Sequence, residues 1–196
     1  NILPTKKLML AIDKDTIIRN AVVPKVWEGN ITEEMRWLYN KEYVSKAELG
    51  LMAILVNNKW ERPIYFANML STDNFMGLDK YLVNEGLVYK LMPVELGQKD
   101  GQVSLVNEDS LYRNITTKFR WGNIANIRHF DSDYRTFVNN YLWEETVGMA
   151  LDTLNRKGKF TQAKHIADIA MNNMPQKIVS TQQAFINTFV VDTLLN

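Results

Sequence analysis

Two acidic triplets are the residues of this sequence best suited to metal chemistry, Asp13-Lys14-Asp15 and Asp131-Ser132-Asp133. In many glycosyltransferases such a carboxylate pair holds a divalent cation that bridges the diphosphate of a sugar nucleotide. Each triplet also stands directly before a helical pattern, where aspartate caps the first turn and interacts favourably with the helix dipole. We therefore expect both triplets to cap helices, and a metal site is the alternative.

The two histidines, His129 and His165, form no recognisable site. A zinc site needs three or more ligands, and only Asp168 stands at helical spacing from His165. The sequence also lacks a G-x-S-x-G nucleophile motif, a G-x-G-x-x-G motif and a phosphate-binding loop. We expect His165 to lie on a helix, at the surface or partly buried. We predict no catalytic residue, no metal ligand and no cofactor.

One tryptophan stands apart from the aromatic residues that we assign to the core. Trp60 lies in a polar connection between a predicted helix and a predicted strand, where side chains can reach solvent. Most of the other aromatic side chains are explained by core packing. We predict that Asn58, Trp60 and Arg62 bind a partner.

Composition limits the classes of protein to which the chain can belong. Its 196 residues are 46% hydrophobic and 23% charged, as in globular domains. Lys plus Arg number 23 and Asp plus Glu number 22, which argues against a nucleic-acid partner. There is no cysteine, so disulfides and thiolate metal sites are excluded. The longest apolar run, residues 49–56, is far shorter than the roughly 20 residues that cross a bilayer.

Short strands and helices alternate in the first half of the sequence. Ser45 and Glu48 form a capping box, and the helix that follows is apolar on every face through Val56, so we expect it to be buried. A short helix should begin at Asp73 or Asn74 and end at Gly86 in a left-handed conformation. Alternating apolar residues predict three strands, at 7–12, 63–67 and 87–92. Because the connections are long, we expect one three-stranded, at least partly parallel sheet covered by helices.

Helical spacing dominates the second half. One helix is predicted over 111–119 and another from Asp133 to Leu154. Gly158, Ala163, Ala170 and Pro175 then match the second half of a tetratricopeptide-type repeat, although Val147 stands where that repeat has an aromatic residue. We expect a tetratricopeptide-like helical hairpin and a third helix over 181–195. The predicted fold is α+β, or small α/β, with a mixed domain over 1–125 and a helical segment over 126–196.

Several segments resemble one family of membrane proteins. They are 57–67 (NNKWERPIYFA), 3–7, 12–15, 20–24, 77–81, 85–94 and 118–123. Together they are similar to the C-terminal soluble part of bacterial multi-spanning membrane proteins related to protein O-mannosyltransferases. The resemblance implies a membrane half that takes sugar from a lipid-linked donor and carries the catalytic acids. It also implies that this part faces the periplasm and has no active site of its own.

The leading hypothesis is a non-catalytic soluble module that presents acceptor polypeptides or docks partners. The N-terminus has neither a starting Met nor a signal peptide, so we interpret the chain as a fragment whose first partner is the membrane half of the same polypeptide. Two alternatives stay open. One is a self-contained sugar-nucleotide enzyme that uses either Asp-x-Asp triplet, and the other is a purely structural cap on the membrane half.

Overall fold

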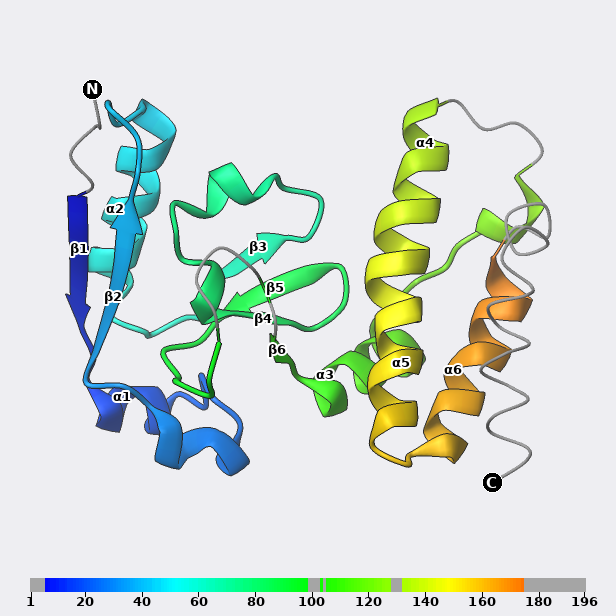
Figure 1. Ribbon diagram of the computed structural model, residues 1–196. Helices are drawn as coiled ribbons and strands as arrows, with labels where there is room; N and C mark the ends of the chain where they lie inside the picture. The colour runs from blue at the N-terminus through cyan, green and yellow to red at the C-terminus, as the bar shows by residue number, and fades with distance from the viewer. Residues whose placement is uncertain (1–5, 99–102, 104, 128–131, 175–196) are drawn as a thin grey trace. The chain divides into compact units, whose positions relative to one another are not determined.

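The computed structural model describes residues 6–98, 103, 105–127 and 132–174 (Figure 1). Its mixture of helices and two sheets confirms the predicted α+β class. The contacts between Cα atoms divide the chain into two compact units. The first combines Asn1–Val83 with Tyr89–Leu105, and the second combines Asn84–Val88 with Val106–Asn196. We call them the sheet unit and the helical unit. The predicted boundary at residue 125 stays a prediction.

The smaller sheet is an antiparallel pair of β1 (Lys6–Ala11) and β2 (Glu34–Tyr39), in which Leu8 stands opposite Trp37. The predicted strand at 7–12 is therefore confirmed. The β2 strand was not predicted, although its buried residues alternate with accessible ones: Met35, Trp37 and Tyr39. This alternation is the pattern of a strand with one buried face.

The larger sheet has the order β3-β5-β4-β6, formed by β3 (Tyr65–Ala67), β4 (Leu82–Asn84), β5 (Val88–Leu91) and β6 (Leu105–Val106). The predicted strands at 63–67 and 87–92 are confirmed as β3 and β5. The prediction of one three-stranded sheet is wrong, because β1 pairs with β2 in a separate sheet. The pair β4–β5 is antiparallel, since a three-residue hairpin cannot join parallel neighbours.

The predicted helix up to Gly86 is also wrong. Two short 3-10 turns, Thr72–Phe75 and Asp79–Tyr81, precede β4 instead. Gly77 interrupts the segment with a φ of +82°, and all three residues of β4 are buried, so both faces of this strand are covered. Gly86 does adopt a positive φ of +115°, but in the β4–β5 hairpin and not at a helix end.

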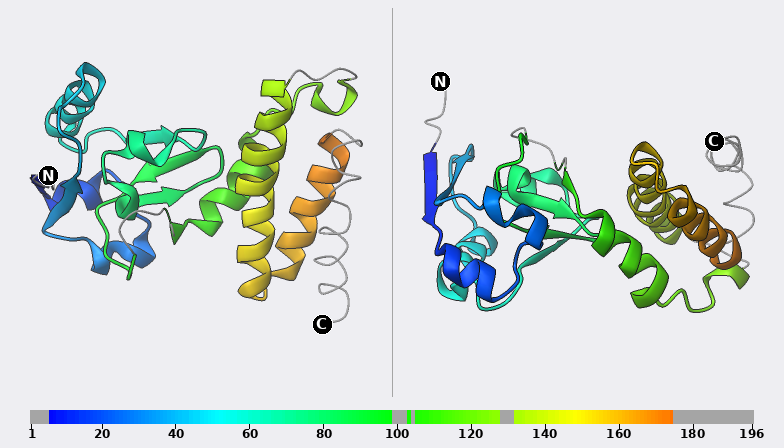
Figure 2. Two further views of the ribbon diagram at one scale, coloured as in Figure 1. Left: turned by 45° about the horizontal axis from the view of Figure 1, so that its top comes forward. Right: turned by 90° about the horizontal axis from the view of Figure 1, so that it is seen from below.

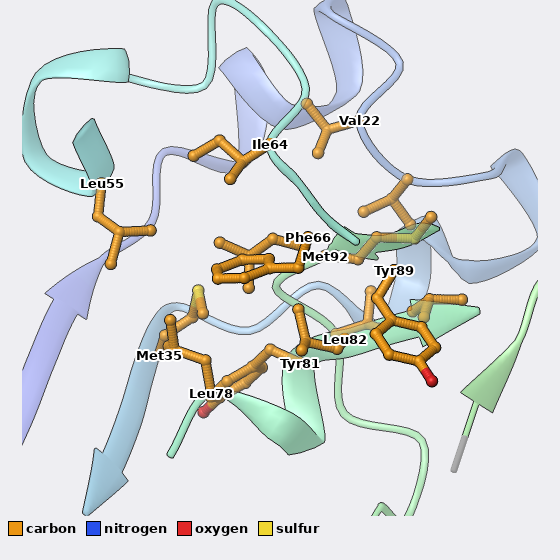
Figure 3. Close-up of a cluster of buried hydrophobic side chains, with 14 of the residues drawn as sticks. Val22, Met35, Leu55, Ile64, Phe66, Leu78, Tyr81, Leu82, Tyr89 and Met92 are labelled. Atoms are coloured by element: carbon orange, nitrogen blue, oxygen red, sulfur yellow. The ribbon is translucent and has the colours of Figure 1, made fainter. Parts of the chain in front are cut away.

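Both sheets contribute to the core of the sheet unit (Figure 3). Phe75 packs edge-to-face against two rings, with centroid distances of 5.8 Å to Phe66 and 5.7 Å to Tyr89. Such pairs add roughly 0.5–1.5 kcal/mol each beyond the burial of their area. This core joins the small sheet, β1 and β2, to strands β3, β4 and β5 of the larger sheet.

Helix α2 (Lys46–Asn58) begins at the predicted capping box. The Glu48 amide donates to Ser45 Oγ over 3.3 Å, and the Ser45 amide donates to Glu48 Oε2 over 2.8 Å. The prediction that this helix is buried is wrong, because only Glu48 and Leu55 are fully covered. An all-apolar pattern does not encode which face of a helix meets the core.

The first helix of the helical unit is α3 (Glu108–Arg113), continued by the π-helical segment Asn114–Lys118, as predicted for 111–119. A continuous helix follows, made of α4 (Ser132–Thr136), the π-helical segment Phe137–Gly148 and α5 (Met149–Arg156). Helix α6 (Phe160–Asn173) packs antiparallel to α5 (Figure 2).

The turn between α5 and α6 confirms the predicted hairpin. Gly158 adopts a φ of +69°, and Ala163 and Ala170 are buried where the paired helices approach each other. The tetratricopeptide type of this hairpin stays a prediction. Pro175 and the helix predicted over 181–195 lie outside the described residues.

Candidate functional site

Strand β1 has one side without a partner strand among the residues that the structure describes. The Ile12 amide donates to Glu33 O over 2.9 Å. Because hydrogen-bonded pairs recur at every second residue of an antiparallel ladder, the even-numbered residues of β1 are the ones bonded to β2. In an antiparallel pair the alternate residues direct their N–H and C=O groups outward. We therefore define the β1 edge as the outward backbone groups of Lys7, Met9 and Ala11.

The opposite edge of this sheet is capped at Arg36 by a side chain. The Arg36 amide donates to Tyr81 Oη over 2.9 Å, and the same hydroxyl donates to Arg36 O over 3.2 Å. Tyr81 is buried and lies 45 residues away in the chain. Within the described ranges, the outer edge of β2 is therefore capped at its middle residue by Tyr81, whereas β1 has no partner strand on its outer side.

A pocket of about 430 Å³ lies beside the β1 edge, and we call it the edge pocket. Leu10 and Ala11 line it from β1, and Leu55 and Val56 line it from the end of α2. Its polar walls come from α1 (Lys14–Arg19) with its capping residue and from the turn after α2: Asp13, Thr16, Arg19, Lys59 and Glu61. The edge pocket therefore offers apolar surface together with charges of both signs.

Asp13 caps α1, which confirms the expectation for the first acidic triplet. Its carboxylate accepts the Thr16 hydroxyl over 2.6 Å and the Asp15 amide over 3.1 Å. Hydrogen bonds from the Thr16 hydroxyl and amide lower the pKa of Asp13. Arg19 in turn donates to Thr16 Oγ1 over 2.8 Å, so this wall of the edge pocket is ordered and charged.

The predicted partner-binding residues lie at and next to the edge pocket, but with different exposure. Trp60 lines it, yet its side chain is only 5% exposed, so the expectation that this ring reaches solvent is wrong. Asn58 orders the turn, because its Oδ1 accepts the Arg62 amide over 3.1 Å. Arg62 is exposed. A binding role for the three residues stays a prediction.

The turn at Trp60 holds an unusual backbone. Lys59 and Trp60 have φ values of +50° and +61°, which bulky residues rarely adopt. The Asn20 side-chain amide donates to Trp60 O over 2.9 Å, and the Glu61 amide donates to Asn58 O over 3.0 Å. These bonds hold the turn against the side of the edge pocket.

Helix α2 presents an apolar surface to solvent, which we call the α2 outer face. It consists of Leu49, Ala53 and Val56, spaced i, i+4 and i+7, whereas Ile54 is exposed on another side of the helix. The exposed fractions are 55% for Leu49, 53% for Ile54 and 62% for Val56. Contiguous exposed aliphatic residues of this kind are typical of an interaction surface.

The remaining candidates for chemistry are not brought together. His165 is exposed on α6, as expected for a helix residue, and its Nδ1 lies 2.8 Å from Tyr112 Oη. Asp168 pairs with Lys164 over 3.0 Å. Residues His129 and Asp131 lie outside the described part of the chain. Among the described residues, no group of three or more His, Asp or Glu could hold a metal.

Sequence reasoning overlooked the β1 edge, because it did not identify β2. Once the alternation over 34–39 is read as a strand, the remaining question is which edge of the pair stays open. That answer depends on Tyr81, whose contact with Arg36 no local pattern encodes.

Comparison with known proteins gives one match. The sequence model of the family described as TMEM260-associated domain 2 matches residues 1–110. No curated protein and no solved structure matches the chain. In the ranges that the structure describes, every helix is too short or too polar to cross a bilayer. The match supports the broader part of the resemblance, a module of a TMEM260-like membrane protein related to protein O-mannosyltransferases. Since the match covers more than half of its residues, the chain belongs to the TMEM260-associated domain 2 family.

Proposed function

We propose that the sheet unit binds an extended segment of an acceptor polypeptide along the β1 edge and presents it to the membrane half of the same protein. The observation that carries this proposal is the contrast between the two edges of the small sheet: Tyr81 occupies the backbone groups of Arg36 on one, and the other has no partner strand in the described residues. An added strand forms main-chain hydrogen bonds with an open edge, which gives affinity with little dependence on sequence.

The edge pocket supplies selectivity in this proposal. A strand lying beside β1 places alternate side chains on the inner face of the sheet, the face of Leu10. One of these side chains enters the edge pocket next to Leu55 and Val56. The charged groups of Asp13 and Arg19 favour a polar side chain that can hydrogen-bond.

Charge favours acidic residues at one end of the bound strand. Lys6 and Lys7 stand at the start of β1, and Asp13 and Asp15 follow its end. An antiparallel partner brings its carboxyl end beside the lysines, so acidic residues there are favoured. The same lysines discourage pairing with neutral strands, a common protection of edge strands.

The parent protein defines the setting of this proposal. A TMEM260-like membrane protein has a membrane half, to which we assign the sugar transfer, and we place the present module on the periplasmic side of a bacterial inner membrane without catalysis of its own. The use of Asp13 as a helix cap gives this Asp-x-Asp triplet a structural role, which favours a module without catalysis of its own.

The test uses the 196-residue chain and a fluorescent eight-residue peptide of alternating threonine and valine with two glutamates at its carboxyl end. Met9→Pro removes an outward N–H, and Met9→Val keeps it while also removing the Met side chain. Met9 is 63% exposed and its amide is not part of the β1–β2 ladder, so both variants should fold. We expect Met9→Pro to weaken binding at least roughly tenfold and Met9→Val to retain it, since one backbone bond is lost.

A second measurement does not depend on a protein variant. Peptides N-methylated at every second residue lose the hydrogen bonds on one of their two edges only. One methylation pattern should abolish binding and the other should leave it unchanged. Equal binding of both peptides, or of Met9→Pro and Met9→Val, would refute strand addition.

The α2 outer face supports a second candidate function, a structural cap that seals the membrane half. Leu49 and Val56 are still more than half exposed in the described residues, and burying the rest of each against a partner contributes roughly half of the 1.5–3 kcal/mol of full burial. This candidate predicts that Leu49→Ser with Val56→Ser lowers the melting temperature of the whole parent protein. The isolated chain should be little affected, because both residues are exposed there. Ile18→Ser, at an exposed aliphatic residue of α1, is the matched control.

A further inference from the structure

The helical unit contains a second cavity, of about 350 Å³, which the proposed function does not use. We call it the aromatic pocket. Its walls come from residues 118–124, from Leu87 and from the π-helical segment Phe137–Gly148. The volume lies within the range of roughly 300–1,000 Å³ that is usual for small-molecule sites.

The lining of the aromatic pocket is mainly apolar. Phe119, Trp121 and Phe137 contribute three rings, and the first two contact each other with a centroid distance of 6.0 Å and an interplanar angle of 61°. Leu142 forms part of the floor and is buried. Phe119, Trp121 and Phe137 are only partly covered by the protein, so a ligand in the pocket would complete their burial.

Two cations stand at the pocket, and no carboxylate of the described residues forms an ion pair with them. Lys118 and Arg120 line it and are exposed. In the described part of the chain, no carboxylate pairs with either of them and no acidic residue lines the pocket. Elsewhere in this unit Lys157 and Lys159 are both paired with Glu108. The aromatic pocket is therefore a locally positive site.

The backbone around the pocket is also unusual. Both Asn114–Lys118 and Phe137–Gly148 are π-helical, a geometry that is rare and is often found at functional sites. The Thr146 hydroxyl donates to Tyr141 O, five residues earlier, over 2.7 Å. This spacing brings Phe137 and Leu142 to the same side of the helix, where both line the pocket.

We propose that the aromatic pocket binds an amphipathic anion, that is, an aliphatic chain of medium length ending in a carboxylate or a phosphate monoester. The chain would pack on the three rings and Leu142. The anionic group would pair with Lys118 and Arg120, because charge-assisted hydrogen bonds to two cations are stronger than neutral ones. Neither an apolar molecule nor a free anion uses both parts of this site.

The test is calorimetric titration of the 196-residue chain with four probes below their micellar concentrations: decanoate, decyl phosphate, decyltrimethylammonium and inorganic phosphate. We expect the two decyl anions to bind at least roughly tenfold more tightly than the decyl cation or inorganic phosphate. The tighter of the two decyl anions identifies the head group. Shifts of the Trp121 indole resonance on titration should locate the site.

Matched variants separate this site from adsorption to the surface. Lys118→Gln with Arg120→Gln should weaken decanoate and decyl phosphate at least roughly tenfold. Arg156→Gln with Lys164→Gln removes the same charge from exposed positions outside the pocket and should leave binding unchanged. Equal binding of the decyl cation and the decyl anions, or equal effects of the two double variants, would overturn the proposal.

Discussion

Gly77→Ala tests the packing that positions the small sheet. Gly77 has a φ of +82°, and a Cβ atom built there would lie 2.3 Å from Leu38 O and 3.3 Å from Leu38 C. Real Cβ contacts are essentially never shorter than 3.0 Å, and the obstructing atom belongs to the backbone of β2. The strand itself must therefore shift to accommodate a methyl group.

The magnitude follows from two contributions. A left-handed conformation costs an L-residue about 1–2 kcal/mol, and overpacking of this kind costs about 1–3 kcal/mol more. We expect Gly77→Ala to lower the free energy of unfolding by about 3 kcal/mol. Gly97→Ala is the matched control, because Gly97 has nearly the same φ, +79°, with no atom within 4 Å of the added Cβ. It should lose only about 1 kcal/mol.

The assay is urea unfolding of the full chain, followed by far-UV circular dichroism and tryptophan fluorescence. The two signals should report the same transition if the sheet unit unfolds as one body. Losses of similar size in Gly77→Ala and Gly97→Ala would show that the contact with Leu38 is not tight. That result would refute the described packing of β2 against the Gly77 turn.

Three further changes test other parts of the fold. Hydrogen bonds from Lys41 and the Ser45 amide lower the pKa of Glu48 to about 2 from 4.5, so the unfolded chain takes up a proton that the folded chain does not. Urea unfolding should therefore show that the free energies of unfolding of wild type and Glu48→Gln approach each other as the pH falls from about 4.5 towards 2. Tyr81→Phe should lower stability by about 1–2 kcal/mol and speed hydrogen exchange at the Arg36 amide, because two backbone groups lose their partner. Gly50→Ala should raise stability by about 0.5–1 kcal/mol, since Gly50 lies inside α2 with open space around it.

Tyr81→Phe has a comparison within the same chain. Tyr43→Phe removes the hydroxyl of an exposed ring and should leave Arg36 exchange unchanged. A pH-independent gap for Glu48→Gln, or equal Arg36 exchange in Tyr81→Phe and wild type, would contradict the assigned hydrogen bonds.

Local signals in the sequence predicted local structure well. The capping box at Ser45 and Glu48, the cap at Asp13 and the turn at Gly158 all depend on residues within a few positions of one another. Each has a specific backbone partner, so spacing alone identifies it. The strands at 7–12, 63–67 and 87–92 were visible for the same reason, through alternation or a short apolar run.

Pairing and exposure were predicted less well, because both depend on distant residues. Nothing near β1 indicates that it pairs with β2, and this pairing divided the expected single sheet into two. Helix α2 is apolar on all sides, so its sequence contains no signal for the face that meets the core. The helix predicted up to Gly86 failed where Gly77 and the doubly buried β4 imposed extended structure.

One part of the candidate site was visible from local signals in the sequence, and the other part depends on contacts between distant residues. The segment around Trp60 was identified from its polar surroundings, and it does lie at the edge pocket, but Trp60 itself is buried. The β1 edge could not be predicted before β2 and the contact of Tyr81 with Arg36 were known. An open edge is defined by the absence of a neighbour, which no single segment encodes.

Amide hydrogen exchange along β1, with and without the threonine–valine peptide, tests the strand-addition proposal most directly. In the free chain the amides of Leu8 and Leu10 should exchange slowly, because they bond to β2, and those of Lys7, Met9 and Ala11 should exchange fast. Saturation with peptide should slow exchange at Lys7, Met9 and Ala11 selectively. Unchanged fast exchange at these three amides in the saturated complex would contradict strand addition at the β1 edge.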